Sequence, residues 1–519
     1  MEDQFDIIII GSGPGGYVAA IKAAKLGKKT ALMESREIGG TCLNRGCIPT
    51  KTLMHSSHLY EEAQNMKEVG IDFTGLSFDY GKIKEHQDQV VSKVRQGIKG
   101  LLEANGVTLL YGAALIQGAI QEESPVAREE RNQLNIKRGY RISLSTQEGV
   151  KDYFADKVLI ATGSKPIIPR IEGVKLENVV TSDELLSLSG VLYRKLLIIG
   201  GGVIGVEFAT IYRELGCEVE IIEAMDRILP GMDKEISQSI AMSLKKKGII
   251  IHTKSKVTRI TKGVEGGLGC EYEDISTGSI TDAVRPIDTI RLSDAIKPSD
   301  IDKLEASTHV TKADGILLSV GRKANAEGLF GDGFSLEMDG ACIKVNQDFE
   351  TNVSGIYAIG DVIKGKQLAH AASAQGIVAV ERMFGKEPTI DINVIPSCIY
   401  TNPEVAVAGI NEAEAAEKGL AVKIGKYPML GNSKTILSMG ERGFIKVVCD
   451  ADTDQILGAQ LLCDRATDMV GEFASAIVNG LTAEDLASVI RPHPTYCEAI
   501  TEAVEDVLGM AIHLVPKKK

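Results

Sequence analysis

Two cysteines lie close together near the start of the chain, in the segment GGTCLNRGCIPTK at residues 39–51. Cys42 and Cys47 could form a metal clip, a structural disulfide or a redox-active disulfide. On an ideal helix, Cα atoms five residues apart are about 8–9 Å from each other, whereas a disulfide needs less than about 7 Å. A bond between them therefore requires a local distortion, which Gly46 and Pro49 can provide. A bond held in this way near a helix start is easier to reduce than a structural one.

A zinc site at this pair would need further ligands at short spacings. His55 and His58 follow, but no second cysteine pair or histidine cluster accompanies them, so the sequence predicts no metal site. Nine cysteines, an odd number with irregular spacing, are not typical of a secreted disulfide framework. We therefore expect a reducing compartment, the cytoplasm, where a close pair is more often catalytic or metal-binding than structural. Two buried, reduced thiols remain the simplest alternative.

A second group of reactive side chains lies near the C-terminal end, in RPHPTYCE at residues 491–498. The ordinary pKa of histidine lies near neutrality, so His493 can move protons to and from a thiol. Glu498 can orient such a histidine and stabilise its cation. The pattern Thr495-x-x-Glu498 is also a capping box at a helix start, so a structural role for Glu498 stays open.

The elements that must position these residues include one unit that occurs twice, at residues 5–34 and 195–223. Each copy is an apolar strand, a glycine motif, a helix and a second strand, and an acidic residue lies 23 positions after the first glycine. The motif residues are Gly11, Gly13, Gly16 and Glu34 in the first copy, and Gly200, Gly202, Gly205 and Glu223 in the second.

This pattern is typical of dinucleotide binding. The first glycine permits a sharp turn, the second lets the backbone approach a pyrophosphate, and the third lets the helix pack against the strand. The helix N-terminus attracts the phosphates, and the acidic residue accepts hydrogen bonds from ribose hydroxyls. Glycine-rich turns without a ligand are the alternative for both copies. Two copies indicate two bound dinucleotides.

The rest of the chain completes an α/β architecture. Apolar runs at 158–166 and 355–362 are expected to be buried strands that end in tight turns. Alternating runs in the last third predict an antiparallel sheet, followed by helices at 466–479 and 483–489. Residues 120–150 and about 265–310 are polar and irregular, and we interpret them as surface insertions between hairpin strands.

Bulk properties exclude several classes of protein. A chain of 519 residues is too long for one core. A net charge of −12 argues against a nucleic-acid partner. No apolar run approaches the roughly 18 residues that a membrane helix needs. The first strand begins near Phe5, so we expect no signal peptide and no membrane association.

Taken together, these motifs resemble the pyridine nucleotide–disulfide oxidoreductases with an early Cys-x4-Cys segment. The resemblance covers nearly the whole chain apart from the two insertions. It includes ATG at 161–163, SVGR at 319–322, GIYAIGDV at 355–362, LAHAAS at 368–373 and HPT at 493–495. The departures are small: Thr50 replaces the usual serine, Arg45 precedes the second cysteine, and YC at 496–497 lies within the HPTxxE element.

The resemblance implies two Rossmann-like domains and a C-terminal α+β dimerisation domain. The implied boundaries are an FAD-binding domain at 1–164, an NAD-binding domain at 165–322, a central segment completing the FAD site at 323–393, and the dimerisation domain at 394–519.

The resemblance also implies which residues bind each cofactor. Glu223 favours the free 2′-hydroxyl of NAD over the 2′-phosphate of NADP. The FAD residues would be Gly11, Gly13, Gly16, Glu34, Lys51, Gly112, Thr162, Gly163, Asp361 and Ala369. The NAD residues would be Gly200, Gly202, Gly205, Glu207, Glu223 and Gly321.

The implied activity is oxidation of protein-bound dihydrolipoyl groups by NAD. Cys42 would be the sulfur that meets the substrate, Cys47 the one nearer the flavin, and His493 with Glu498 the acid–base pair. The histidine would reach the cysteines of the other subunit, in an obligate homodimer. The implied partners are the lipoyl domains of 2-oxo acid dehydrogenase or glycine-cleavage complexes.

Other interpretations stay open. They are a related glutathione- or mercuric-reductase-like enzyme, and a flavoprotein scaffold whose redox activity is incidental. Cys497 has no role that we can argue, and we expect a buried small residue there. Cys217, Cys270 and Cys398 are likewise expected to be non-catalytic.

Overall fold

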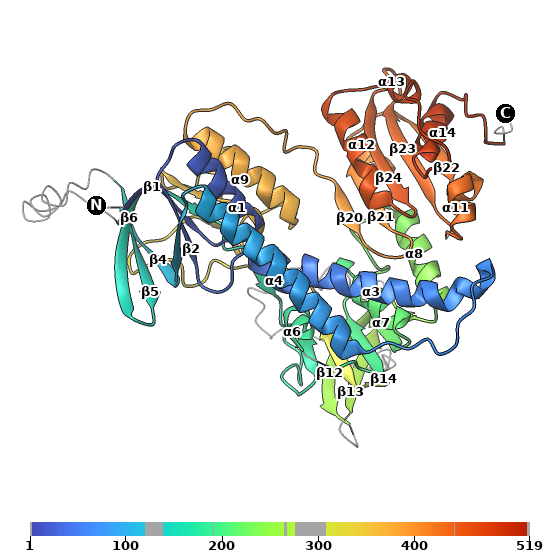
Figure 1. Ribbon diagram of the computed structural model, residues 1–519, viewed down its shortest axis with the longest axis horizontal. Helices are drawn as coiled ribbons and strands as arrows, with labels where there is room; N and C mark the ends of the chain where they lie inside the picture. Colours follow the sequence, from blue (N-terminus) through green and yellow to red (C-terminus); the bar gives the residue numbers. More distant parts are fainter. Residues whose placement is uncertain are drawn as a thin grey trace, which may run out of the picture.

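The computed structural model describes residues 3–119, 139–188, 190–263, 267–275, 308–440 and 442–515. Within these residues the chain forms three units, each built on its own main sheet. Figure 1 shows the N-terminal unit, the green central unit and the orange-red C-terminal unit as separate lobes. The predicted fold class, two dinucleotide-binding units and a C-terminal α+β unit, is confirmed.

The first unit contains a seven-stranded sheet. Its strands are β1 (Gln4–Ile10), β2 (Thr30–Glu34), β3 (Thr108–Tyr111), β4 (Ala113–Ala119), β5 (Tyr140–Thr146), β6 (Gly149–Ile160) and β19 (Ile356–Ala358). The order is β3-β2-β1-β6-β5-β4, and β19 pairs with β6 in parallel. Ile7, Ile8 and Ile9 are fully buried, which explains why the sequence of β1 is a continuous run of apolar residues.

Residues distant in the sequence complete this unit. Helices α1 (Pro14–Lys25) and α9 (Ala369–Met383) pack against each other beside the sheet (Figure 1). At their crossing a Cβ on Gly376 would lie 2.6 Å from the carbonyl oxygen of Gly15, so this position must stay glycine. The Lys22–Glu381 ion pair of 2.6 Å joins the same two helices.

The second unit repeats the first arrangement with a parallel sheet. Its strands are β8 (Val179–Thr181), β9 (Lys195–Ile199), β10 (Glu218–Ile222), β11 (Ile250–His252) and β15 (Gly315–Leu318), and its helices are α6 (Ser182–Ser187), α7 (Val203–Glu214) and α8 (Lys234–Lys246). The strand order is β11-β10-β9-β15-β8. A two-stranded link between β7 (Ser164–Pro166) and β16 (Arg322–Ala324) lies at its border with the first unit.

The prediction that residues 120–150 form a surface insertion is wrong from Tyr140 onward. Residues 140–146 form β5, which pairs with β4 and β6. Tyr140, Ile142 and Leu144 are buried, and the residues between them include polar ones. This alternation is typical of a strand that has one face toward the core. Residues 120–138 lie outside the described residues.

The predicted loop at 265–310 is likewise too wide. A three-stranded antiparallel sheet is formed by β12 (Ser255–Lys262), β13 (Leu268–Asp274) and β14 (Thr308–Ala313). Leu268, Cys270 and Tyr272 alternate toward the core of this sheet. Residues 276–307 lie outside the described part of the chain.

The third unit is an antiparallel sheet covered by helices, as predicted. Its strands are β20 (Ser397–Ile399), β21 (Val405–Gly409), β22 (Val422–Pro428), β23 (Phe444–Asp450) and β24 (Ile456–Leu462), and its helices include α10 (Glu412–Glu417), α11 (Ser433–Leu437), α12 (Ala466–Val478), α13 (Ala483–Ala487) and α14 (Glu498–Val507). The strand order is β20-β21-β24-β23-β22. Helices α12 and α14 pack on this sheet and bury Phe473 and Ile500 in its core.

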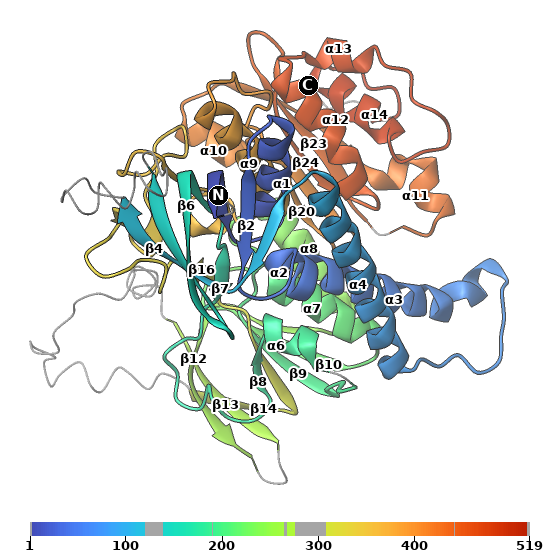
Figure 2. The same cartoon turned by 60° about the vertical axis from the view of Figure 1, so that its left-hand side comes forward.

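Three further helices connect the lobes: α2 (Gly40–Arg45), α3 (Cys47–Asn65) and α4 (Tyr80–Ala104). Helix α3 begins beside the first unit and packs against α7 of the second unit and against α4. Figure 2 shows α3 and α4 extending together to one side of the molecule. No helix among the described residues combines the length and the apolar character needed to cross a membrane.

A buried lysine joins the second and third units. Lys446 on β23 lies 3.2 Å from Asp233, which caps α8, and 3.1 Å from both Glu235 and Glu412. The Lys446 side chain is only 4% exposed. Its ammonium therefore holds together carboxylates from two lobes that would otherwise repel one another.

We predict that Lys446→Met destabilises the protein by about 3 kcal/mol, because it leaves the buried Asp233 without its cation. The matched control is Lys423→Met, which removes an exposed lysine paired with Asp454 and should leave the Tm nearly unchanged. Differential scanning calorimetry of both variants checks this. Equal Tm values for the two variants would contradict the role of Lys446.

Candidate active site

Cys42 and Cys47 form a disulfide, as the sequence predicts, and their Cα atoms are 4.7 Å apart. The predicted distortion lies at Gly46, where α2 ends and α3 begins, with φ −146° and ψ −113°. A Cβ on Gly46 would lie 3.0 Å from the carbonyl oxygen of Thr41, a tight contact, so glycine there favours the close approach of the two segments. Pro49 lies in the first turn of α3, not at the break.

The surroundings of the disulfide favour a thiolate at Cys47. Cys47 is the first residue of α3, whose N-terminus has no side-chain cap. The partial positive charge of a free helix N-terminus stabilises an anion at this position. Asn44, which sequence reasoning missed, supports the turn: its Nδ2 donates to Gly40 O at 2.8 Å and its Oδ1 accepts from Arg95 at 2.9 Å.

One cleft of about 1580 Å³ brings together most of the predicted site residues. Its lining includes both cysteines and the residues Gly11, Gly13, Glu34, Lys51, Gly112, Thr162, Gly163, Asp361, Ala369, Gly200, Gly202, Glu207, Glu223 and Gly321. Gly16 and Gly205 do not line it. They lie below the glycine loops, where a Cβ would overlap the carbonyl oxygens of Gly11 and Gly200 respectively.

The two glycine loops fit dinucleotides. Gly13 and Gly202 are the N-caps of α1 and α7, and neither helix has a side-chain cap, so their N–H groups remain available to a pyrophosphate. A Cβ at either glycine would meet nothing within 4 Å, so each loop leaves open space for a ligand. Ala369 begins α9, another helix without a side-chain cap at the same cleft.

Each acidic residue at the end of the second strand holds its own glycine loop. Oε2 of Glu34 accepts from the backbone N–H of Ser12 at 2.9 Å and from its hydroxyl at 2.6 Å. Oε2 of Glu223 accepts from the backbone N–H of Gly201 at 2.6 Å. Ser12 and Gly201 lie between the motif glycines, where only the folded loop reveals their function. The ribose contacts of Glu34 and Glu223 stay predictions.

An ion pair links the two predicted cofactor sites. Lys51 on α3 lies 2.8 Å from Glu207 on α7, whose side chain is 5% exposed. Tyr400, which sequence reasoning missed, donates its backbone N–H to Glu207 at 3.1 Å and offers its ring to the Lys51 ammonium at 4.6 Å. Lys51 is therefore held at one place in the cleft by groups from the second and third units.

Polar contacts position the remaining cleft residues of the first unit. Asp361 accepts from the hydroxyl of Ser164 at 2.6 Å, and Thr162 donates to the carbonyl of Asn325 at 2.7 Å. Gly112 has φ +154°, and a Cβ there would lie 2.5 Å from the carbonyl oxygen of Ser145. The roles of Asp361, Thr162 and Gly112 in FAD binding stay predictions.

His493 and Glu498 form a pair at the start of α14, away from the cleft. His493 Nδ1 lies 2.7 Å from Glu498 Oε1, while Oε2 accepts from the backbone N–H of Thr495 at 2.8 Å. The predicted capping box is therefore only half formed. Glu498 accepts from the Thr495 N–H, but Cys497 is the N-cap of α14, no side chain caps that helix, and the Thr495 hydroxyl donates to the carbonyl of Pro492. Burial opposes ionisation, but the Thr495 N–H and His493 outweigh it and lower the pKa of Glu498. The His493 side chain is 70% exposed.

The other seven cysteines are unpaired. Cys217 and Cys270 are buried as expected, and burial raises the pKa of the Cys270 thiol to about 12. Cys398 and Cys497 are only partly buried, and for Cys497 this corrects the expectation of burial. Both pack against the core of the C-terminal unit.

Comparison with protein families gives two matches that together span most of the chain. The family described as pyridine nucleotide-disulphide oxidoreductase matches residues 5–376. The dimerisation domain of the same family matches residues 395–504.

Curated relatives match over nearly their whole length. A dihydrolipoyl dehydrogenase of Bacillus subtilis is 38% identical over 99% of this chain and 100% of its own. The mitochondrial dihydrolipoyl dehydrogenase of Pisum sativum is 36% identical over 99% and 93%. A leghemoglobin reductase of Glycine max is 36% identical over 96% and 87%.

Solved structures share the fold. LpdA from Mycobacterium tuberculosis superimposes with a TM-score of 0.80 at 23% identity and covers 96% of this chain and 98% of its own. The flavoprotein disulfide reductase RclA from Escherichia coli has a TM-score of 0.78 at 24% identity, covering 97% and 99%.

The glycine geometry generates a matched pair of predictions. Gly202→Ala places its methyl group in open space, so we expect an unchanged Tm and a KM for NAD raised about tenfold or more. Gly205→Ala overlaps the Gly200 carbonyl and should lower the Tm in the absence of NAD. Calorimetry and steady-state kinetics check the two variants. An unchanged KM in Gly202→Ala would contradict a dinucleotide at this loop.

Proposed function

The chain belongs to the pyridine nucleotide-disulphide oxidoreductases, and on that premise we propose that it oxidises protein-bound dihydrolipoyl groups with NAD as acceptor. The observation that carries the proposal is the Cys42–Cys47 disulfide in one cleft with both glycine loops. Full-length similarity to dihydrolipoyl dehydrogenases supports it.

The residues of the cleft fit FAD at the first loop and NAD at the second. Gly13 and Ala369, at the N-termini of α1 and α9, offer backbone N–H groups to one pyrophosphate, and Gly202, at the N-terminus of α7, to the other. Gly11 and Gly200 instead make the sharp turns, since their own N–H groups donate to the carbonyls of Met33 and Ile222. When bound, FAD supplies the two-electron chemistry that connects a dithiol to a nicotinamide.

Glu223 supports NAD over NADP. Its carboxylate lies at the end of β10, lines the cleft and is 8% exposed. A fixed negative charge there accepts hydrogen bonds from ribose hydroxyls but repels a 2′-phosphate.

Thiol–disulfide exchange is the work of the chain's own residues. His493 removes the proton from a substrate thiol, and the thiolate attacks Sγ of Cys42. The Cys42–Cys47 bond breaks, a mixed disulfide forms on Cys42, and Cys47 leaves as a thiolate at the N-terminus of α3. The second substrate thiol then attacks the substrate sulfur of the mixed disulfide, and its proton passes to the sulfur of Cys42 as that sulfur leaves. The lipoyl disulfide is released, and both enzyme cysteines are left reduced.

Glu498 prepares His493 for this proton transfer. Its lowered pKa keeps the carboxylate ionised, so it accepts from Nδ1 and leaves Nε2 to take the substrate proton. The same carboxylate stabilises the imidazolium that forms.

A second copy of the chain completes the site. His493 is exposed and does not line the cleft that holds the cysteines, and residues 395–504 match a dimerisation domain. We therefore place His493 of one subunit at the disulfide of its partner. An exposed histidine on a dimerisation domain suits this arrangement, because it comes close to the substrate only when the two subunits assemble.

The partners proposed are lipoyl domains of 2-oxo acid dehydrogenase or glycine-cleavage complexes, since a lipoyl group on a domain is a dithiol able to enter such a cleft. The proposed compartment is the cytoplasm, which fits seven unpaired cysteines.

Steady-state assays of the holoenzyme test the proposal. We expect dihydrolipoamide and a reduced lipoyl domain to be oxidised with NAD far more efficiently than with NADP. Oxidised glutathione and mercuric ion should be poor substrates with either reduced nucleotide. The Cys42→Ser variant, which lacks the attacked sulfur, should lose turnover. Efficient NADPH-dependent reduction of glutathione, or full turnover by Cys42→Ser, would sink the proposal.

The Glu498 carboxylate generates a further prediction. Glu498→Gln should lower kcat about 100-fold, because an amide cannot stabilise the imidazolium, while its oxygen can still accept from Thr495. The Tm should stay close to wild type.

The matched control is Glu502→Gln, one turn further along α14. This substitution also removes a carboxylate from a histidine pair, since Glu502 lies 2.6 Å from His513. We expect near wild-type kcat from it. A Glu498→Gln variant with normal kcat but a lowered Tm would show that Glu498 only stabilises the helix start.

A further inference from the structure

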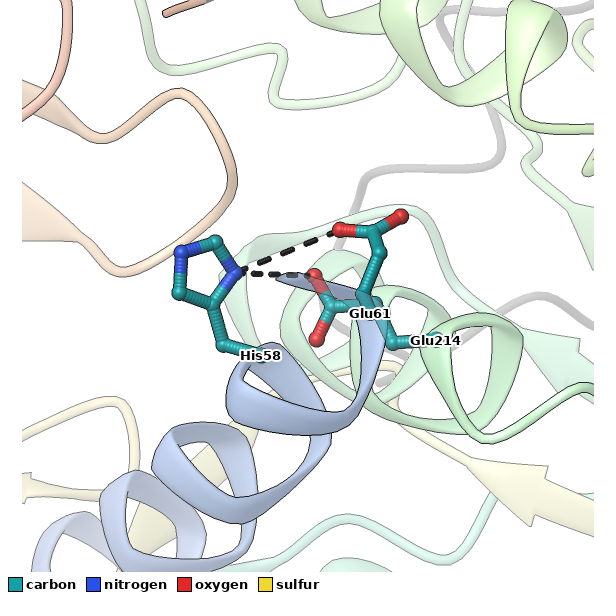
Figure 3. A group of neighbouring side chains, drawn as sticks. All are labelled: His58, Glu61 and Glu214. Carbon is teal, nitrogen blue, oxygen red and sulfur yellow. Dashed lines mark ion pairs between the residues drawn. The ribbon is translucent and has the colours of Figure 1, made fainter. Parts of the chain in front are cut away.

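A second group of ligand-type side chains lies where the three units meet. His58 and Glu61 occupy one face of α3, well beyond the redox cysteines, and Glu214 is the last residue of α7. Figure 3 shows both carboxylates on the same side of the His58 ring, with ion pairs drawn from one ring nitrogen to both. The described residues around it come from all three units, because Asn402 follows β20 of the third.

The potential ligand atoms converge. His58 Nδ1 lies 3.7 Å from Glu214 Oε1 and 4.0 Å from Glu61 Oε2, and all three atoms lie within 4.8 Å of one another. The other ring nitrogen, Nε2, lies 3.3 Å from Glu62. A carboxylate at Nε2 orients a histidine so that Nδ1 presents its lone pair to a metal ion.

Glu214 supplies an independent reason to expect a cation. Its side chain is only 1% exposed, and Oε2 accepts from the hydroxyl of Ser57 at 2.6 Å. Oε1, which faces His58, has no hydrogen-bond donor among the described residues. A buried carboxylate oxygen without a donor is costly unless a positive charge satisfies it.

Lys247 is the one ammonium that faces the cluster in the described structure. Its Nζ lies 2.8 Å from Glu61 and 3.6 Å from Glu214, so it neutralises Glu61 directly and Glu214 only at longer range. When His58 is neutral, the carboxylates of Glu61, Glu62 and Glu214 exceed this ammonium by two negative charges. Glu214, with Glu62 and Glu61, outweighs burial and raises the pKa of His58, so a metal ion at Nδ1 would take the place of a proton there. A divalent cation matches that excess.

We propose that His58, Glu61 and Glu214 bind a first-row divalent transition-metal ion such as Zn²⁺. One imidazole and two carboxylates form a mixed nitrogen and oxygen donor set, which suits these ions better than Mg²⁺ or Ca²⁺. Ligands about 2.1 Å from a tetrahedral ion are roughly 3.4 Å apart, so the present separations need only small side-chain rotations.

Asn402 is placed to provide a fourth ligand. Its side-chain amide lies 3.3 Å from His58 Nδ1 and 3.4 Å from Glu61 Oε2. Rotating the amide by half a turn presents its oxygen to the same point. The bound ion would then join α3, α7 and the segment after β20, and so tie all three units together behind the active site.

Zinc binding to the oxidised holoenzyme tests this site without any turnover, so its result is independent of the proposed function. The intact disulfide removes Cys42 and Cys47 as thiolate ligands. We expect one Zn²⁺ per subunit in chelator-competition titrations, with the dissociation constant raised at least tenfold by His58→Gln. Lys247→Gln removes the competing ammonium and should lower the dissociation constant.

Two histidine variants serve as controls. His513→Gln removes a more exposed histidine that is also paired with a glutamate, and it should leave Zn²⁺ affinity unchanged. His493→Gln tests whether the ion instead occupies the His493–Glu498 pair. Co²⁺ in place of Zn²⁺ should show no sulfur-to-metal charge transfer, because the site contains no cysteine.

Three results would overturn the proposal. The first is a wild-type enzyme that binds no Zn²⁺, which would mean that Lys247 alone balances the cluster. The second is a His58→Gln variant that binds as tightly as wild type. The third is binding that disappears in His493→Gln but persists in His58→Gln.

Discussion

The break between α2 and α3 is the constraint on which the rest of the site depends. A Cβ at position 46 would lie 3.0 Å from the Thr41 carbonyl oxygen, so glycine there favours the close approach of the preceding segment to the first turn of α3, where Cys42 and Cys47 bond. The same break leaves the N-terminus of α3 uncapped at Cys47. Geometry and electrostatics therefore act together: the bond can form, and one of its sulfurs has a favourable place for negative charge when the bond opens.

Helix α3, which begins at this break, also contacts the second and third units through its charged side chains. Lys51 pairs with Glu207 of the second unit and faces Tyr400 of the third, while further along the helix His58 faces Glu214 and Asn402. Lys446 joins the second and third units from the other side. Buried or partly buried ion pairs thus occur at several contacts between the units. Removing one member of such a pair would leave the charge of the other uncompensated.

Much of the fold could be predicted because its signals are local. The duplicated strand–glycine–helix–strand unit and the apolar strands of the C-terminal sheet follow from residues that are adjacent in the chain. Strands β5 and β13 were not predicted, because each has polar residues on one face. In β5 the alternation of the apolar Tyr140, Ile142 and Leu144 is also too short to stand out. The sequence pattern of Glu498 fits both a capping box and an orienting residue, and it could not show that the Thr495 hydroxyl turns to Pro492 and leaves the box half formed.

By itself, the sequence determined the chemistry: a close cysteine pair, two glycine loops with their acids, and a histidine five residues before a glutamate. These features depend on residue type and short spacing, which the local chain geometry converts directly into structure. Only the tertiary structure decided that both loops and the disulfide share a cleft, that His493 lies outside it, and that Glu214 faces His58. Most of these contacts join residues more than a hundred positions apart, and all of them depend on how helices and sheets pack rather than on a local pattern.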